Sequence, residues 1–346
     1  MKIQLVHNRI PHHASHSGYA QIHRYLQDLV PVENLHSVSG PAPILRWVWD
    51  RLIDRSETDW YNTGSLSLEI ATGWKLLRRS HEIYHILYGE DTFRYLGSLG
   101  GIARLKKSKI VCSYHQPAAI FEKVVRHKES IRKLDAVIAV STGQAAYFAS
   151  FLEPSRVFFV PHGVDTTFYH PVPRPAGDRV RCLCVGQWLR DYDMLKSVAQ
   201  RLGARDPRLS FTVITSAEAA IALRDMGNLV AATGVSEEDL LRAYQRADIF
   251  VLPLTDCTAN NALLEALACG LPVVTTSVGG IADYVDSGCA IAVPRGDLDR
   301  MCDAVVALAD DEELRKRMAA HGRRRSLEFD WRKIAGRVLD VYSAVA

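Results

Sequence analysis

The residue of this sequence that is best suited to a chemical role is Glu265, the single charged residue within an otherwise apolar helical segment. That segment follows the apolar run IFVLPL at 249–254, which is typical of a buried parallel strand. We expect Asn260 or Asn261 to cap the helix and Gly270 to end it. A helix that begins after a parallel strand directs unpaired N–H groups at the crevice where such folds bind phosphate-bearing ligands. Glu265 is therefore placed to accept hydrogen bonds from a ribose diol, or it is an ordinary solvated helix position.

Two other groups of residues have the composition of metal sites. His12, His13 and His16 lie in one polar loop, RIPHHASHSGYA, but no carboxylate or cysteine completes a ligand set there. The D-x-D at 191–193 recurs at 297–299, and we interpret its aspartates as first-turn helix residues that the helix dipole favours. The sequence therefore predicts no metal site.

Strands and helices alternate along both halves of the chain, which indicates an α/β fold. The first half opens with the strand KIQLVHN, a glycine-containing loop and a helix, and a later strand, KIVCSYHQP, ends at His115. Residues 171–178 (PVPRPAGD) are typical of a linker because three prolines and a glycine stand close together. The strand RVRCLCVGQWL, with Gly186 at its end, then opens a second half of the same kind.

Composition agrees with a globular protein of two domains. The chain has 346 residues, of which 48% are hydrophobic and 23% charged. It contains no uncharged apolar run of about 18 residues, and its N-terminus is typical of a strand rather than a signal peptide. Seven cysteines without paired spacing indicate free thiols in a reducing cytoplasm, and Cys182 with Cys184 is no zinc site without a second pair.

Several segments carry a family resemblance. NALLEALACGLPVVTTSVGG is similar to EAMACGxPVVATxxGG, PHGVDTTF to P-N/H-GVD-x-x-x-F, and EFDWRK to F-x-W. These are segments of the retaining, nucleotide-sugar-dependent GT-B glycosyltransferases of family 4, the glycosyl transferases group 1. Members carry an E-x7-E signature whose second glutamate contacts the donor ribose and whose first contacts the donor sugar. Glu265 matches the second glutamate, whereas Cys257 occupies the position of the first and Asp256 lies beside it.

The resemblance implies roles for particular residues. Arg190 stands near the position of a family cation that holds the donor diphosphate, with Gln187 in place of the usual arginine and Lys196 as an alternative. The expected catalytic residues are His115, Asp256 and Arg190, and the expected acceptor contacts are His16, Tyr19 and His162. The expected donor-binding residues are Gly18, Gly186, Arg190, Lys196, Gly234, Val235, Asn260, Asn261 and Glu265.

Charge and tryptophan content bear on the acceptor. Residues 1–170 hold 20 Lys and Arg against 15 Asp and Glu, whereas residues 171–346 hold 22 against 24. A basic first half suits an anionic membrane surface or a phosphate-bearing acceptor, although a solvated face explains it equally well. Four tryptophans with nearby arginines could form a surface for a lipid-linked acceptor, although core packing is the commoner fate of such residues. They are Trp47, Trp49, Trp60 and Trp74.

The resemblance as a whole implies an α/β protein of the GT-B class, with two doubly wound Rossmann-like domains facing each other across a cleft. Residues 1–172 form the expected acceptor-binding domain, 173–327 the nucleotide-sugar-binding domain, and 328–346 a helix that crosses back to the first domain. The implied enzyme is a hexosyltransferase-type glycosyltransferase, acting with retention of configuration and without an essential metal or other cofactor. Its implied donor is a nucleoside diphosphate sugar, UDP by family frequency, and its acceptor a glycan, lipid-linked or small-molecule hydroxyl.

The expected setting is polysaccharide biosynthesis in the cytoplasm or peripherally at the inner membrane surface, with no nucleic acid as partner. Two alternatives stay open because the first glutamate of the signature and the usual arginine are replaced. One is a non-catalytic nucleotide-sugar-binding partner subunit, and the other is a different enzyme on the same fold, such as a nucleotide-sugar epimerase or a phosphorylase.

Overall fold

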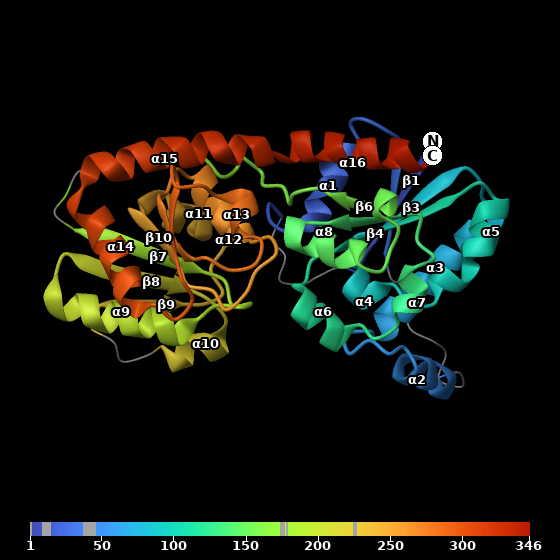
Figure 1. The fold of residues 1–346 in the computed structure, drawn as a ribbon, viewed down its shortest axis with the longest axis horizontal. Coiled ribbons are helices and arrows are strands. Elements are labelled where there is room, and N and C mark those ends of the chain that lie inside the picture. The colour runs from blue at the N-terminus through green and yellow to red at the C-terminus, as the bar shows by residue number, and fades with distance from the viewer. Residues whose placement is uncertain (1, 9–14, 37–45, 174–176, 178, 224–226) are drawn as a thin grey trace. The chain divides into compact units, whose positions relative to one another are not determined.

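The computed structural model describes residues 2–8, 15–36, 46–173, 177, 179–223 and 227–346, which form two compact units (Figure 1). Unit 1 takes its described residues from 2–8, 18–161 and 331–346, and unit 2 from 15–17 and 162–330. Apart from residues 15–17, the chain passes to unit 2 at His162 and returns to unit 1 at Trp331. Within the predicted linker, residues 174–176 and 178 lie outside the described residues.

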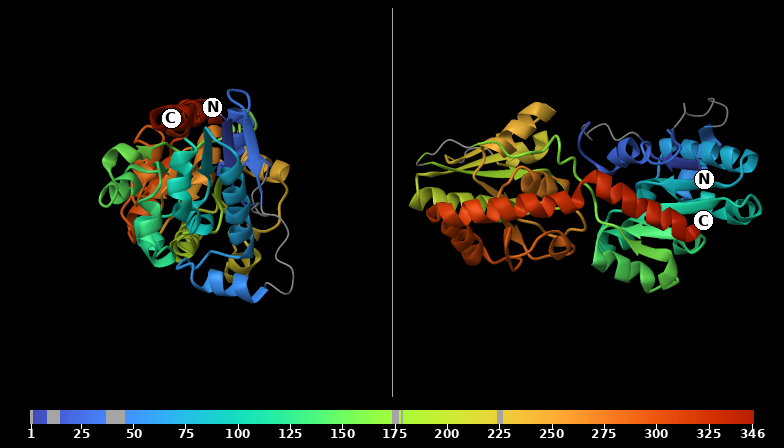
Figure 2. Two further views of the ribbon diagram at one scale, coloured as in Figure 1. Left: turned by 90° about the vertical axis from the view of Figure 1, so that its right-hand side faces the viewer. Right: turned by 90° about the horizontal axis from the view of Figure 1, so that it is seen from above.

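Unit 1 contains a six-stranded parallel sheet in the order β2-β1-β3-β4-β5-β6. Its strands β3 and β5 are buried along their whole length, as expected for a sheet that is covered on both faces (Figure 2). The strands are β1 (Lys2–Val6), β2 (Val32–Leu35), β3 (Glu82–Ile86), β4 (Lys109–Tyr114), β5 (Ala136–Ala139) and β6 (Val157–Phe159).

Helices cover both faces of the unit 1 sheet (Figures 1 and 2). The longest is α3 (Thr63–Arg78), where Asn62 caps the first turn through the backbone amides of Gly64 and Ser65. The others are α1 (Ile22–Leu26), α2 (Arg46–Asp54), α4 (Gly89–Thr92), α5 (Gly100–Leu105), α6 (Ala118–Val124), α7 (Lys128–Ile131), α8 (Thr142–Ala149) and α16 (Trp331–Val345). Short 3-10 turns are η1 (Tyr19–Gln21), η3 (Leu96–Leu99) and η4 (Pro154–Arg156).

Unit 2 contains a second six-stranded parallel sheet, in the order β12-β11-β10-β7-β8-β9. Its first three strands run outward from β7 and its last three outward from β10, which is the strand order of the Rossmann fold. The strands are β7 (Val180–Val185), β8 (Leu209–Ile214), β9 (Leu229–Ala232), β10 (Ile249–Leu252), β11 (Val273–Thr276) and β12 (Ala290–Val293).

The helices of unit 2 pack on the sheet and form two apolar clusters, one on each side of it. One cluster is built around α12 and the other around α9 and α14. The helices are α9 (Tyr192–Arg205), α10 (Ala217–Ala222), α11 (Glu237–Arg246), α12 (Asn261–Ala268), α13 (Ile281–Tyr284), α14 (Leu298–Asp310) and α15 (Glu312–Ser326), with the 3-10 turn η5 (Leu327–Phe329).

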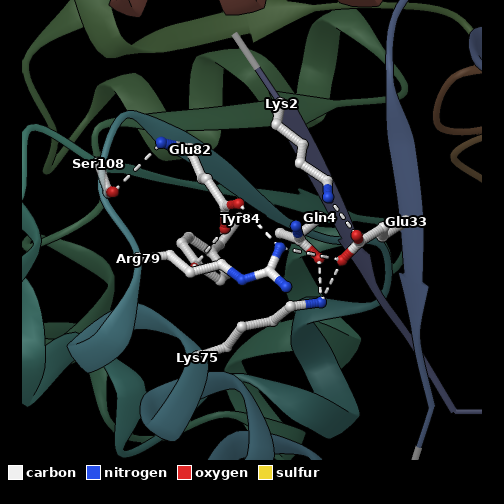
Figure 3. A network of polar contacts seen from close by, with 8 residues as sticks. All are labelled: Lys2, Gln4, Glu33, Lys75, Arg79, Glu82, Tyr84 and Ser108. Carbon is white, nitrogen blue, oxygen red and sulfur yellow. Dashed lines mark hydrogen bonds and ion pairs between the residues drawn. The ribbon is translucent and has the colours of Figure 1, made fainter.

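A charged network lies toward the amino ends of the unit 1 strands (Figure 3). Glu33 on β2 accepts hydrogen bonds from Lys2 and from Lys75, the latter at 2.5 Å, and these bonds lower the pKa of Glu33 to about 2. Arg79, at the end of α3, contacts both Glu33 and Glu82, at 3.4 and 3.3 Å. These charges therefore join β1, β2 and β3 to α3 at the end of the sheet away from the carboxyl ends of the strands.

The C-terminal helix α16 belongs to unit 1, where it packs against α1. The Trp331 ring lies edge-on to Tyr19, with ring centroids 5.6 Å apart, and is stacked with Tyr25 at 6.5 Å. Trp331 is almost completely buried. The last segment of the chain thus supplies part of the core of the first unit.

A buried chain of hydrogen bonds runs from α16 over the neighbouring strands β3 and β4 of the unit 1 sheet. The Tyr342 hydroxyl lies 2.6 Å from Nδ1 of His85 on β3, and Nε2 of His85 lies 2.7 Å from the Ser113 hydroxyl on β4. Ser113 donates to the Tyr19 hydroxyl at 3.2 Å, so it accepts from His85 and Nε2 carries the ring proton. Burial lowers the pKa of His85 to about 3, which keeps the imidazole neutral.

The α/β class with two doubly wound Rossmann-like domains, predicted from the sequence, is confirmed. Helix α2, which carries Trp47 and Trp49, has no buried residue. Trp47 and Trp74 are 67% and 57% exposed, whereas Trp60 packs against the core. Among the described residues, no helix has the length and apolar character needed to cross a membrane.

Candidate functional site

The candidate site of unit 2 lies between the neighbouring strands β7 and β10, because the chain continues from β7 and from β10 toward opposite edges of the sheet. Ligands of open α/β sheets bind outside the carboxyl ends of the strands at such a switch point. Helix α12 begins just beyond β10, and the Asn260 side chain caps it by accepting the backbone N–H of Leu263 at 3.1 Å. Asn261 is the first helical residue. The predicted strand, loop and helix therefore present the start of α12 at this crevice.

Glu265, one turn into α12, is only 4% exposed and is therefore not a solvated helix position. Its Oε1 accepts the Ser17 hydroxyl at 2.7 Å, and its Oε2 accepts the Tyr244 hydroxyl at 2.8 Å. Burial raises the pKa of Glu265, while the hydrogen bonds from Ser17 and Tyr244 oppose that rise. The carboxylate is thus held by neutral donors, and each oxygen has acceptor capacity for one more hydrogen bond.

Residues 15–17, in the polar loop after β1, pack with unit 2. The backbone N–H of His16 donates to Glu237 at 2.7 Å, and its Nδ1 lies 2.8 Å from Oδ2 of Asp165. The His16 ring is stacked on Phe168, with centroids 4.0 Å apart. Burial raises the pKa of Asp165, but hydrogen bonds from the Phe168 amide and His16 outweigh it, so the pKa is lowered overall. His16 therefore anchors the loop that delivers Ser17 to Glu265.

Arg190 is held against the end of β7. Its Nε and one terminal nitrogen donate to the Val185 carbonyl at 2.9 and 2.7 Å, and the other terminal nitrogen donates to the Trp188 carbonyl at 2.9 Å. It also contacts the Asn260 side chain at 3.4 Å, which brings a positive charge to the start of α12. Gly186 has φ +95°, and a Cβ there would lie 2.4 Å from the Arg190 guanidinium. Arg190 is thus part of the turn itself, and its predicted role in phosphate binding stays a prediction.

The loop that carries Asp256 and Cys257 is held by hydrogen bonds within it and to the Gly279–Gly280 turn. Oδ1 of Asp256 accepts the backbone N–H of Cys257 at 2.7 Å, and the Cys257 carbonyl accepts the N–H of Gly280 at 2.8 Å. The Cys257 thiol is buried, which raises its pKa to about 12. A Cβ on Gly279, whose φ is +47°, would lie 1.9 Å from the Cys257 carbonyl oxygen. The Gly279–Gly280 turn therefore fixes the loop at the end of the site where the sequence departs from the family pattern.

Three predicted donor-binding residues lie on other elements of unit 2. Gly234 and Val235 form the turn between β9 and α11, where Gly234 has φ +63° and the space around its missing Cβ is open. Lys196 lies in the second turn of α9 and is partly exposed. The Tyr244 side chain links α11 to Glu265, so α11 belongs to the same region as α12.

Unit 1 brings Gly18, Tyr19 and His115 together. Gly18, with φ +89°, precedes the turn that buries Tyr19, and burial raises the pKa of Tyr19 to about 12. The His115 ring lies 4.6 Å from Tyr19, and its Nε2 lies 2.8 Å from the Leu87 carbonyl oxygen. His162 instead belongs to unit 2, where its side chain is buried and its Nδ1 lies 2.8 Å from the Gly163 carbonyl.

Ser17, Tyr244 and Asp165 contact predicted site residues, and no pattern in the sequence indicated these contacts. Tyr244 lies on the buried face of a strongly amphipathic helix, where a tyrosine is expected to pack in the core. Within the described residues, no group of three His, Cys, Asp or Glu side chains could hold a metal ion. His12 and His13 lie outside the described residues.

Residues 179–311 match the family described as glycosyl transferases group 1. The D-inositol 3-phosphate glycosyltransferase of Geodermatophilus obscurus is 28% identical over 253 residues, covering 65% of this chain and 56% of that protein. The GDP-mannose-dependent alpha-(1-6)-phosphatidylinositol monomannoside mannosyltransferase of Mycolicibacterium smegmatis is 27% identical over 310 residues, covering 79% and 80%. The chain therefore spans little more than half the length of the first of these relatives.

Solved structures show the same fold. Sucrose-phosphate synthase from Thermosynechococcus elongatus superposes with a TM-score of 0.70 at 17% identity, covering 99% of this chain and 98% of that one. HepE from Anabaena, in complex with UDP, has a TM-score of 0.69 at 13% identity, covering 99% and 100%. The GT-B fold class predicted from the sequence is confirmed.

Proposed function

We propose that this protein, whose residues 179–311 form a glycosyl transferases group 1 domain, transfers a sugar from a nucleoside diphosphate sugar to a hydroxyl acceptor. We further propose a UDP-sugar as donor, retention of configuration, and a glycan, lipid-linked or small-molecule acceptor. The observation that carries the proposal is the buried Glu265 carboxylate beside the start of α12. The Rossmann strand order of unit 2 supports it, because nucleotides bind at the switch point of such sheets.

Glu265 has the properties required for ribose recognition. Its two oxygens accept one hydroxyl each from Ser17 and Tyr244, so the carboxylate is oriented before any ligand binds. A ribose diol offers two further donors, and charge-assisted hydrogen bonds to a carboxylate are stronger than neutral ones. The two side-chain hydroxyls thus position Glu265 while leaving acceptor capacity for the diol.

Negative charge develops on the diphosphate as it leaves the sugar, and this charge must be stabilised by positive charge nearby. We propose that the N–H groups at the start of α12 and the Arg190 guanidinium provide it, since Arg190 contacts the cap residue Asn260. This arrangement would serve without an essential divalent ion. A departing phosphate oxygen would take the proton of the acceptor hydroxyl on the same face of the sugar, which preserves the configuration.

In unit 1, we propose that His115 and Tyr19 contact the acceptor hydroxyl. The two rings lie edge to face at the carboxyl end of the sheet, and the hydrogen-bond chain from α16 holds Tyr19 from behind. His115 would orient the acceptor hydroxyl rather than act as an obligatory base. His162, which is buried with its Nδ1 at 2.8 Å from the Gly163 carbonyl oxygen, is a weaker candidate for that contact.

The sugar end of the donor is proposed to meet the loop at Asp256. Asp256 is partly exposed, whereas Cys257, which stands at the family's first glutamate, is buried. If Asp256 contacts the donor sugar, Asp256→Ala should lower turnover well beyond Cys257→Ala. Equal and small effects of both variants would remove Asp256 from the proposal.

A membrane-associated acceptor is supported by one surface of unit 1. Trp74 on α3 is exposed, with the Arg78 guanidinium 5.2 Å from its ring centroid, and α2 with the exposed Trp47 packs against α3. We propose peripheral contact of this surface with an anionic cytoplasmic membrane face. Co-sedimentation with anionic vesicles should weaken in Trp74→Ala but not in Trp188→Ala, an exposed tryptophan of unit 2. Equal binding by both variants and the wild type would count against it.

The decisive experiment measures donor binding and product formation together. Thermal shifts with UDP-, GDP-, ADP- and dTDP-sugars identify the donor, where a shift with GDP-mannose alone would replace UDP in the proposal. Mass spectrometry of reactions with a pool of hydroxyl acceptors then tests for transfer, and Glu265→Ala should lose nucleotide affinity.

The alternatives predict different products. A partner subunit would bind a donor without turnover against any acceptor, and an epimerase would convert the free donor into a new nucleotide sugar. Slow donor hydrolysis without acceptor, together with a glycosylated product, supports the transferase.

A further inference from the structure

The turn after β4, which carries His115, contacts the short helix α4, which follows the neighbouring strand β3. Helix α4 packs directly against β4, since a Cβ on Gly89 would lie 2.4 Å from both the Cys112 sulfur and the Tyr114 ring. Only glycine permits so close an approach. The residue after it, Glu90, is thereby carried to the end of β4.

Glu90 accepts two backbone amides of this turn. Its Oε1 accepts the N–H of His115 and the N–H of Gln116, the second at 2.8 Å, and the side chain is 3% exposed. On the other side of the turn, the Gln144 amide donates to the Gln116 carbonyl at 2.9 Å. The Gln144 oxygen in turn accepts the Val140 N–H at 2.8 Å, which fixes its orientation. The turn is therefore held from both sides by buried side chains.

The same β3–α4 loop also holds the His115 ring. Nε2 lies 2.8 Å from the Leu87 carbonyl oxygen, and a carbonyl only accepts, so Nε2 carries the proton. In the neutral ring, Nδ1 is then a hydrogen-bond acceptor. The ring lies between Tyr19, at 4.6 Å, and Tyr88, at 5.0 Å, which limits its rotation. The backbone contact to Glu90 and the ring contact to Leu87 together determine the tautomer and the position of the ring.

We propose that Glu90 is a positioning residue, which holds the β4–α6 turn so that His115 keeps its Nε2–H tautomer and its ring position. The consequence for catalysis rests on the proposed glycosyl transfer, whereas the effect on His115 does not. A buried carboxyl group is costly to a core, and burial raises the pKa of Glu90 to about 7. Groups with such shifts gather at functional sites.

The test reads the His115 tautomer by ¹⁵N NMR of the full chain with labelled histidines, the signal being assigned by its loss in His115→Gln. Glu90→Leu removes the acceptor, and Glu90→Asp withdraws it by one methylene while keeping the charge. Glu90→Gln keeps a carbonyl oxygen at the same reach. We expect mixed tautomers in the first two variants and the wild-type tautomer in the third.

Glu69 on α3 is the matched control. It is also a buried carboxylate of unit 1 that accepts backbone amides, those of Arg94, Tyr95 and Leu96, but none from the His115 turn. Glu69→Gln should leave the His115 signal unchanged. With a donor in hand, Glu90→Asp should lower kcat by up to about a hundredfold with little change in donor KM, and Glu90→Gln should restore most of it.

The proposal is overturned if Glu90→Asp leaves the His115 tautomer as in the wild type, or if Glu69→Gln shifts it equally. Should Glu90→Leu fail to fold, the comparison of Glu90→Asp with Glu90→Gln still decides. Because the signal is read without substrate, a chain that transfers no sugar would refute the proposed function and leave this result standing.

Discussion

Replacing Gly279 with alanine should damage unit 2 more than the same change at Gly296. Both glycines have left-handed backbone conformations, with φ +47° and +81°, so alanine costs about 1–2 kcal/mol at either position. Only at Gly279 does the new Cβ meet other atoms, at 1.9 Å from the Cys257 carbonyl oxygen and 2.7 Å from Oδ1 of Asp256. Overpacking of this kind adds about 1–3 kcal/mol. The expected loss is therefore about 2–5 kcal/mol at Gly279 and about 1–2 kcal/mol at Gly296.

Urea unfolding followed by far-UV circular dichroism measures both losses, since the two glycines lie in the same unit. The clash is relieved by moving the loop of Asp256 and Cys257, so Gly279→Ala should also slow any sugar transfer at temperatures where the protein stays folded. Gly296→Ala should not. Equal losses of unfolding free energy in the two variants would refute the reasoning that the Gly279 turn sets the loop.

Three further outcomes are expected. Arg190→Lys keeps the charge but loses the forked donation to two carbonyls, so the free energy of unfolding should fall by about 1–3 kcal/mol in urea; an unchanged midpoint would mean the turn does not need the guanidinium. Tyr244→Phe removes one hydrogen-bond donor from the buried Glu265, so nucleotide affinity measured by calorimetry should fall by about tenfold or more. Unaltered affinity would show that Tyr244 does not belong to the site. The pKa of His85 is lowered to about 3, so the unfolded chain binds the extra proton below pH 6.5. Stability should then fall by up to about 1.4 kcal/mol per unit of pH from 6.5 toward 3, and His85→Gln should flatten that slope in acid titrations.

Sequence patterns anticipated the parts of the site that depend on local order. The strand, cap and helix around Asn260 and Glu265 follow from hydrophobic periodicity and from the capping preference of asparagine, both of which act over a few residues. The pattern could not decide whether Glu265 is solvated, because its burial depends on Ser17 and Tyr244. Ser17 lies 248 positions away in the chain. Such pairs leave no spacing in the sequence.

Arg190 illustrates a second limit. The resemblance identified a cation near the diphosphate position, but the sequence does not show that the guanidinium also holds the Val185 and Trp188 carbonyls. Gly186 carried the relevant hint, because a glycine after a strand often makes room for a close contact. Glu90 was missed for a similar reason, since its partners are backbone amides and carry no side-chain signature.

The return of α16 to unit 1 has a consequence for the order of events on the ribosome. The first unit is synthesised almost entirely before the second, yet Trp331 and Tyr342, which complete its core and its hydrogen-bond chain, emerge only after the second unit. Until then, the α1 face and the imidazole of His85 lack their contacts with α16. The first unit therefore finishes folding only after the whole of the second has been translated. A stop codon shortly before residue 331 would remove α16 and leave the first unit incomplete.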